Sequence, residues 1–309
     1  MNFQQFEYIL AIEAYGSFSK AAESKFLSQP ALSMMVQKLE EELDVKIFDR
    51  SKQPIVPTDM GKPILEQARV ILHEISKLHE ITRQQRETLS GELSIGIIPT
   101  LAPYLLPLFL KPFLEKYPAV HLKIYEYTTA SIVGQLKKGH LDVGLLVTPL
   151  PQALLKETPL FYESFYVYAH DEYAKNYLLP EDINPDELWL LEEGHCLRSQ
   201  ILNLCELRKK SNSQLEFEAG SIDTLIKMVD HQSGVTIIPE LATLTLSKEQ
   251  RKRLRPFAPP VPVREVSLVT HRDIVKKSLI EALRIQVLAS LPKLATKAGE
   301  GERVDIGKV

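Results

Sequence analysis

Cys196 and Cys205 are the only two cysteines in the chain of 309 residues. Between them, Leu197, Ile201 and Leu204 recur at helical spacing, which predicts a helix that begins near Cys196. Nine residues of helix advance about 13 Å and leave the two sulfurs on opposite faces, whereas a disulfide needs Cα atoms about 4.4–6.8 Å apart. A bond between the two sulfurs would therefore require this segment to unwind, as in an order–disorder switch.

Cys196 has the sequence surroundings of a reactive thiol. His195 and Arg198 bring potential positive charge, and the N-terminus of the predicted helix adds partial charge of the same sign. All three features lower the pKa of a thiol. Cys205 lies instead among the leucines at 202, 204 and 207, which would hide its thiol. The alternative is that both cysteines are incidental buried residues, and residue types alone leave that alternative open.

The composition limits the class of protein. The chain is 44% hydrophobic and 25% charged with a net charge of -3, which is ordinary for a soluble protein. Two cysteines cannot form a four-cysteine zinc site or a disulfide-stapled scaffold. No apolar run reaches the ~18 residues of a membrane span, and the N-terminus lacks a signal-peptide pattern. We therefore expect a cytoplasmic protein with no membrane partner. Because no metal-ligand spacing, phosphate loop or dinucleotide motif occurs, we expect no metal and no cofactor.

Three short helices are predicted at the start of the chain. The first ends at Gly16, the second covers residues 18–26 and the third covers residues 30–43. Prolines keep residues 54–57 extended. From residue 64 an apolar seam follows in steps of four and three, which favours a dimerisation helix over one that packs on its own domain; the seam consists of Ile64, Ala68, Ile71, Ile75, Leu78 and Thr82. After residue 91, strands and helices alternate, which predicts a mostly parallel sheet with helices on both faces.

Residues 17–33 have the spacing of a helix-turn-helix. Ala21 and Ala22 are small enough for two helices to cross closely, Ser28 is a good N-cap, and Pro30 suits a first helical turn. The positions then left to meet DNA are Ser28, Gln29, Pro30, Ser33, Met34 and Gln37, with Arg50 and Lys52 near phosphates. Residues 1–90 hold eleven lysines and arginines against thirteen acids. Charge therefore leaves a simple packing module open as an alternative.

This segment resembles the winged helix-turn-helix of LysR-type transcriptional regulators, and residues 39–43, 47–50, 58–61 and 136–144 extend the likeness. The resemblance implies an all-α winged helix-turn-helix domain at 1–60, a linker and dimerisation helix at 61–90, and a two-lobed α/β regulatory domain, like a periplasmic binding protein, at 91–296. The polar residues 297–309 are expected to form a disordered tail. The chain departs from the family pattern at Asp44, where glycine is usual, at Pro57, and at Pro63 in the linker helix.

The run from His195 to Cys205 resembles the peroxide-sensing members of that family. The resemblance implies that the Cys196 thiolate attacks hydrogen peroxide, becomes a sulfenic acid and condenses with Cys205. It implies further roles for residues that hold or activate the peroxide, or lie close to the reduced cysteine: Thr100, Thr129, His195, Arg198 and Arg264. The chain departs from this group at residues 232–234, where Gln-Ser-Gly replaces Gly-x-Gly, and at Glu216, where a histidine can occur.

The sequence thus favours a peroxide-sensing transcription factor rather than an enzyme, an activator of oxidative-stress genes. The family implies promoter DNA, RNA polymerase, thiol reductants and a homodimer or homotetramer as partners. One alternative is a LysR-type regulator that binds a small organic effector between the lobes. Another is a thiol peroxidase with an appended DNA-binding domain, which fits less well because turnover favours an easily reached resolving thiol. Counting free thiols after peroxide treatment separates the three.

Overall fold

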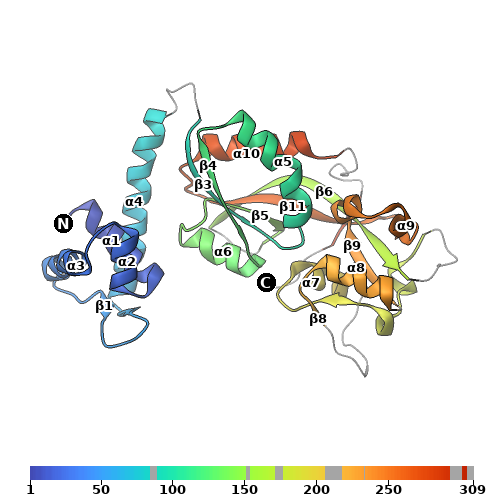
Figure 1. Cartoon of the computed structure of the whole chain (residues 1–309), viewed down its shortest axis with the longest axis horizontal. Coiled ribbons are helices and arrows are strands. Elements are labelled where there is room, and N and C mark those ends of the chain that lie inside the picture. Colours follow the sequence, from blue (N-terminus) through green and yellow to red (C-terminus); the bar gives the residue numbers. More distant parts are fainter. Residues whose placement is uncertain are drawn as a thin grey trace. The chain divides into compact units, whose positions relative to one another are not determined.

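The structure is a computed structural model that describes residues 1–83, 89–150, 154–170, 177–205, 218–232, 234–292 and 301–304. The chain divides into two compact units, Met1–Glu87 and Thr88–Val309, which are described separately. In the first unit, three helices precede a short antiparallel wing and a longer helix (Figure 1). These elements are α1 (Phe3–Tyr15), α2 (Phe18–Ser24), α3 (Gln29–Leu43), β1 (Phe48–Asp49), β2 (Val56–Pro57) and α4 (Gly61–Arg83). The predicted helix-turn-helix with a wing is confirmed.

Local sequence explains where these helices begin and end. Ser17 and Ser28 cap α2 and α3, each through a side-chain oxygen that accepts a backbone N–H three residues later. Gly16 ends α1 in the left-handed region, as the sequence predicted. Asp44 ends α3 with a φ of 51°, also left-handed. That conformation explains why glycine is usual there, and aspartate is among the few other residues that tolerate it.

The start of helix α4 packs on its own domain, which the sequence analysis gave as the alternative to dimerisation. Leu65 and Ala68 are buried in the hydrophobic core of the first unit, with Ile64 and Ile71 packed against it. The first turns of α4 therefore pack on their own domain. Pro63 lies in the first turn, where proline breaks no helical hydrogen bond. Ile75 is half-buried, and the side chains of Leu78 and Thr82 lie outside the described residues, so dimerisation through α4 stays a prediction.

The second unit is built on a mixed eight-stranded sheet. Its main path is β10-β6-β11-β5-β3-β4, with β9 beside β6 and β12 beside β11. The strands are β3 (Gly91–Ile97), β4 (Val120–Glu126), β5 (Val143–Thr148), β6 (Leu155–Ala169), β9 (Val235–Pro239), β10 (Leu254–Pro256), β11 (Pro262–His271) and β12 (Glu302–Arg303). The prediction of a mostly parallel sheet is wrong, because β6 and β11 run antiparallel to each other and β11 runs antiparallel to β5. Hydrophobic periodicity identifies a buried strand but does not fix its direction.

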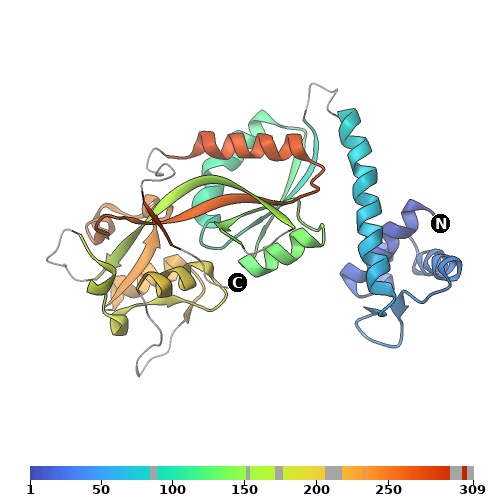
Figure 2. The same cartoon turned by 180° about the vertical axis from the view of Figure 1, so that it is seen from behind.

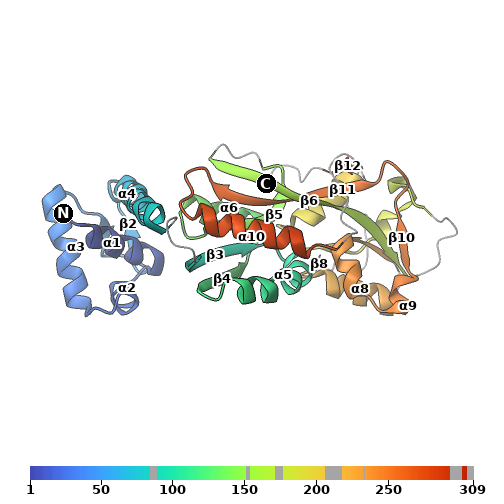
Figure 3. The ribbon, with the colours of Figure 1, turned by 90° about the horizontal axis from the view of Figure 1, so that it is seen from above.

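Two long strands connect the lobes of this unit. The first part of β6 pairs with β11, and its last five residues pair with β9. In the first lobe, α5 (Ala102–Lys116) and α10 (Lys277–Ser290) cover one face of the sheet and α6 (Thr129–Lys137) covers the other (Figure 2). Helices α5 and α10 lie side by side (Figure 3). The two-lobed α/β architecture is confirmed.

The second lobe holds the predicted cysteine helix. It contains α7 (Cys196–Leu204), α8 (Ile222–His231), α9 (Lys248–Arg251) and the parallel pair β7 (Leu190–Leu191) and β8 (Glu218–Ala219). Three 3-10 turns complete it: η1 (Pro180–Asp182), η2 (Pro185–Glu187) and η3 (Glu240–Thr245). Trp189, Ile201 and Leu225 belong to the core of this unit or pack against it.

Part of the C-terminal segment is ordered, contrary to the predicted disordered tail. Glu302 and Arg303 form β12, which pairs in parallel with Pro262 and Val263 of β11. The Val304 side chain is buried, which gives this short segment an apolar anchor. The sequence showed only its polar, glycine-containing composition. The rest of residues 297–309, like Ser233 and Glu216, lies outside the described residues.

Candidate functional site

Helix α7 separates the two thiols as the spacing predicted. Cys196 is its first residue, with His195 as the N-cap, and Cys205 caps its C-terminus through an N–H donated to Ile201 O at 3.0 Å. Both cysteines are free thiols, Cys196 buried and Cys205 half-buried. The full helix between them holds the sulfurs too far apart to bond.

The pKa of the Cys196 thiol is raised by burial, against the lowering that the sequence predicted. The positive charge of Arg264, the Thr129 hydroxyl and the backbone N–H groups of Leu197 and Cys196 each lower the pKa, but burial outweighs them. The predicted contribution of the helix N-terminus is therefore confirmed. The raised pKa favours the thiol over the thiolate, while Arg264, Thr129 and the backbone N–H groups would stabilise a thiolate once it forms.

Neither His195 nor Arg198 is among the groups that shift the Cys196 pKa, contrary to the expectation from the sequence. Arg198 donates from Nη1 to the carbonyl of Leu191 at 2.6 Å, and His195 Nε2 lies 3.5 Å from a Glu192 carboxylate oxygen. The charge that lowers the thiol pKa comes instead from Arg264, on a distant strand. Proximity along the chain was misleading here, because the side chains of a helix's first turn point in different directions.

Arg264 joins three of the predicted residues in one buried cluster. Its side chain is fully buried on β11, and its Nη1 donates to Thr100 Oγ1 at 3.0 Å while Nη2 donates to the Thr100 carbonyl at 3.2 Å. Thr129, at the start of α6, is also buried. Apart from its influence on the thiol, Thr129 Oγ1 has no hydrogen-bond partner among the described residues. Its hydroxyl can therefore bind a small polar molecule beside Cys196.

Sequence reasoning missed Glu163, the buried counter-charge of this cluster. Glu163 is 1% exposed and stands directly opposite Arg264 in the β6–β11 register. Its Oε1 accepts from Arg264 Nε at 2.7 Å, and its Oε2 accepts from the backbone N–H of Leu241 at 3.0 Å. Within an apolar strand, an acid whose partner is a hundred residues away gives no local signal.

Cys205 occupies a less reactive place. Burial raises the pKa of its thiol to about 11, and it packs against the hydrophobic core together with Leu202 and Leu204. The sequence expectation of a hidden second thiol is consistent with this. The helix end that it caps fixes the position of Cys205.

The exposed face of α3 carries the residues predicted to meet DNA. Gln29, Pro30, Met34 and Gln37 are exposed, while the core-facing residues Leu32, Val36 and Leu39 are buried. Ser28 serves as the N-cap, with its Oγ 3.4 Å from the N–H of Ala31. Ser33 is half-buried.

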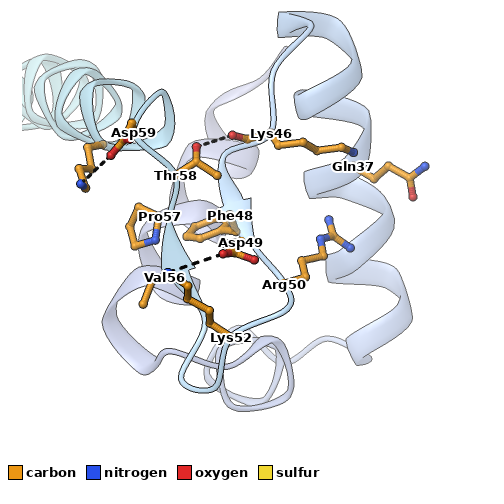
Figure 4. A pocket seen from close by; sticks show the side chains of 11 residues that line it. Gln37, Lys46, Phe48, Asp49, Arg50, Lys52, Val56, Pro57, Thr58 and Asp59 are labelled. Atoms are coloured by element: carbon orange, nitrogen blue, oxygen red, sulfur yellow. Dashed lines mark hydrogen bonds and ion pairs between the residues drawn. The ribbon is translucent and has the colours of Figure 1, made fainter.

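Arg50 was predicted to lie near phosphates, and in the structure it also connects the wing to α2 and α3. It lies 3.3 Å from the buried Glu40 carboxylate, donates to Ser33 Oγ at 3.1 Å and stacks on the Phe18 ring at 4.7 Å. An open hollow lies beside it, between α3 and the wing (Figure 4). Its charged lining consists of Lys46, Arg50, Lys52, Lys62, Asp49 and Asp59. The excess of cations is local, which explains why the overall charge did not indicate it.

Comparison with known proteins places the chain. Residues 3–62 match the bacterial regulatory helix-turn-helix proteins of the lysR family, and residues 86–292 match the LysR substrate binding domain. The chain belongs to the LysR family. Within this family it is 33% identical over 305 residues to the DNA-binding transcriptional dual regulator OxyR of Escherichia coli strain K12, covering 96% of this chain and 100% of that one.

Solved structures of OxyR proteins share the fold of this LysR-family chain. A full-length cysteine-to-aspartate variant of OxyR from Pseudomonas aeruginosa superposes with a TM-score of 0.80 and 31% identity, over 96% of this chain and 100% of that one. A cysteine mutant of Corynebacterium glutamicum OxyR with hydrogen peroxide bound gives a TM-score of 0.60 and 27% identity, over 94% and 92%. These are similarities of the chain and do not assign its individual residues.

The described part of the chain contains neither a candidate membrane-spanning helix nor a candidate metal site. None of its helices combines the length and apolarity that crossing a bilayer requires. Nowhere in the same residues do three or more His, Cys, Asp or Glu side chains gather as metal ligands.

Proposed function

We propose that the protein is a cytoplasmic DNA-binding transcriptional regulator that senses hydrogen peroxide through a reversible Cys196–Cys205 disulfide. The observation that carries the proposal is the placement of Cys196. This thiol is buried at the start of α7 beside Arg264 and Thr129, with Thr100 held by Arg264 and the second thiol at the other end of the helix. The likeness to OxyR proteins, one of them with peroxide bound, supports it.

In the first chemical step, the Cys196 thiolate attacks one oxygen of hydrogen peroxide. An S–O bond forms as the O–O bond breaks, so that sulfur loses two electrons and becomes a sulfenic acid. The leaving hydroxide takes up the proton that the thiol released, which gives water. Arg264 stabilises the thiolate, and the Thr100 and Thr129 hydroxyls hold the peroxide; His195 and Arg198 keep their proposed role of orienting it.

In the second step, the Cys205 thiol attacks the sulfenic sulfur. The S–S bond forms and the hydroxyl leaves as water with the Cys205 proton. Because a folded α7 advances about 13 Å along its axis between the two cysteines, this step requires α7 to unwind. A dithiol reductant of the cell returns two electrons and restores the helix.

The unwinding of α7 is the structural change that would be transmitted to the DNA-binding domains. In a homodimer or homotetramer, a changed regulatory lobe would shift the subunits and reposition paired α3 helices on the promoter, where RNA polymerase is engaged. The DNA contacts would come from Ser28, Gln29, Pro30, Ser33, Met34, Gln37, Arg50 and Lys52.

A promoter footprint taken with reduced and peroxide-treated protein tests the function. We expect the protected region to change on peroxide treatment in the wild type and to stay unchanged in Cys196→Ser and Cys205→Ser. A footprint that responds to peroxide in both serine variants would refute the proposal. A response to small organic acids instead of peroxide would favour an effector-binding regulator.

A further inference from the structure

Glu163 lies in the cluster around Cys196 but touches neither the thiol nor the threonine hydroxyls predicted to hold peroxide. It reaches the site only through Arg264, the residue directly opposite on the neighbouring strand. Both side chains are buried almost completely. A single buried charge is costly, so each of the two needs the other to remain ionised inside the protein.

The hydrogen bonds of Glu163 fix the direction of the Arg264 guanidinium. Glu163 Oε1 lies 2.7 Å from both Nε and Nη2 of Arg264, so this edge of the guanidinium faces away from Thr100 Oγ1, which Nη1 contacts. The other carboxylate oxygen accepts from the backbone of Leu241 at the start of η3. Both carboxylate oxygens of Glu163 are therefore fixed by hydrogen bonds, and Glu163 binds one edge of the Arg264 guanidinium.

The charge of Glu163 also limits what Arg264 does to the thiol. A guanidinium paired with a carboxylate presents nearly no net charge at a distance, whereas an unpaired one would favour the nearest anion. Burial keeps the Cys196 pKa above its ordinary value despite Arg264. Paired in this way, Arg264 still lowers the Cys196 pKa, but burial raises that pKa by more.

We propose that Glu163 is a positioning residue of the peroxide-sensing site. Its geometry orients Arg264 toward Thr100, and its negative charge offsets part of the attraction of Arg264 for a Cys196 thiolate. The peroxide part of this inference rests on the proposed function, but the effect on the thiol does not.

Two substitutions separate charge from position. Glu163→Gln keeps an oxygen for Arg264 Nε but loses the charge, so the positive charge of the guanidinium is no longer offset and lowers the Cys196 pKa further. Glu163→Asp keeps the charge, but its shorter side chain withdraws from Nε. Glu265→Gln is the matched control, because Glu265 is a buried carboxylate on β11 that is paired with a different arginine, Arg303, rather than with Arg264.

The first measurement is the titration of Cys196 in the full chain carrying Cys205→Ser, followed by the ultraviolet absorbance of the thiolate. The same chain with Cys196→Ser gives the blank, which removes every signal that does not come from Cys196. We expect Glu163→Gln to lower the Cys196 pKa by about one unit, or tenfold more thiolate at a fixed pH below it. Glu163→Asp and Glu265→Gln should leave it unchanged. An unchanged or raised pKa in Glu163→Gln would overturn the proposal.

The second measurement is the rate of peroxide reaction divided by the fraction of thiolate. We expect Glu163→Asp to slow it about tenfold, as loss of one oriented interaction does, and Glu163→Gln to slow it no more than about threefold, since a thiolate of lower pKa is less nucleophilic. The reverse order would overturn the positioning role. If the parent protein does not react with peroxide, the proposed function fails, while the titration still decides the effect of Glu163. If Glu163→Gln does not fold, Glu163→Asp decides: a normal rate per thiolate refutes the proposal.

Discussion

Weakening the packing of α7 should make the disulfide more stable, because in the proposed mechanism only the thiol form keeps this helix folded. Leu197 follows Cys196, is fully buried and belongs to the hydrophobic core. Replacing a buried leucine by alanine costs about 2–5 kcal/mol. If the disulfide form has already released Leu197 from the core, the whole cost falls on the thiol form. With 30 mV equal to about 1.4 kcal/mol for two electrons, Leu197→Ala should make the disulfide potential at most about 40–110 mV more negative.

The assay equilibrates the protein in a series of glutathione redox buffers and counts the thiols that remain at each potential. The control is Leu145→Ala on β5, which is equally buried but lies in the first lobe. This control should destabilise both redox forms alike and leave the potential unchanged. A potential for Leu197→Ala that is unchanged, or less negative, would refute the reasoning, because it would mean that α7 stays packed in the disulfide form.

Three further predictions test other parts of the structure. Ending the chain at residue 301 removes the Val304 carbonyl that accepts a hydrogen bond from the buried Gln200 of α7. An unpaired buried amide would destabilise the thiol form by about 1–3 kcal/mol. The disulfide potential should therefore become about 20–60 mV more negative in the same assay. Burial raises the pKa of Glu240 from 4.5 to about 7, so stability should fall by up to about 3 kcal/mol as pH rises between these values, and urea unfolding should show no such fall in Glu240→Gln. Gln29→Ala should weaken specific promoter binding about tenfold, or 1–3 kcal/mol per lost base contact, while Gln286→Ala on α10 should not; equal affinities in a binding titration would refute the placement of Gln29.

Local patterns carried much of the fold. The spacing of Leu197, Ile201 and Leu204 predicted a helix that begins near Cys196, and α7 begins at that residue. Ser28 with Pro30 correctly indicated the start of α3. Both inferences depend on residues three or four apart, whose side chains meet on one helix face. For the starts of these two helices, the local sequence pattern was sufficient.

The parts that failed depend on contacts between distant segments. The direction of β6 and β11 is set by their pairing, which no alternation of side chains records. The positive charge that lowers the Cys196 pKa was expected from its chain neighbours. It comes instead from Arg264, which is held by Glu163 across the strand pair. The net rise of the thiol pKa follows from burial, which becomes known only once the lobe is assembled around the helix.

The most direct test of the central claim is a count of free thiols after reduced protein meets one equivalent of hydrogen peroxide under denaturing quench. The account expects both thiols of each wild-type chain to be lost and a Cys196–Cys205 disulfide to appear in the peptide map. In Cys196→Ser, the remaining Cys205 thiol should survive. Two unchanged thiols in the wild type, or loss of the Cys205 thiol in Cys196→Ser at the wild-type rate, would contradict the account.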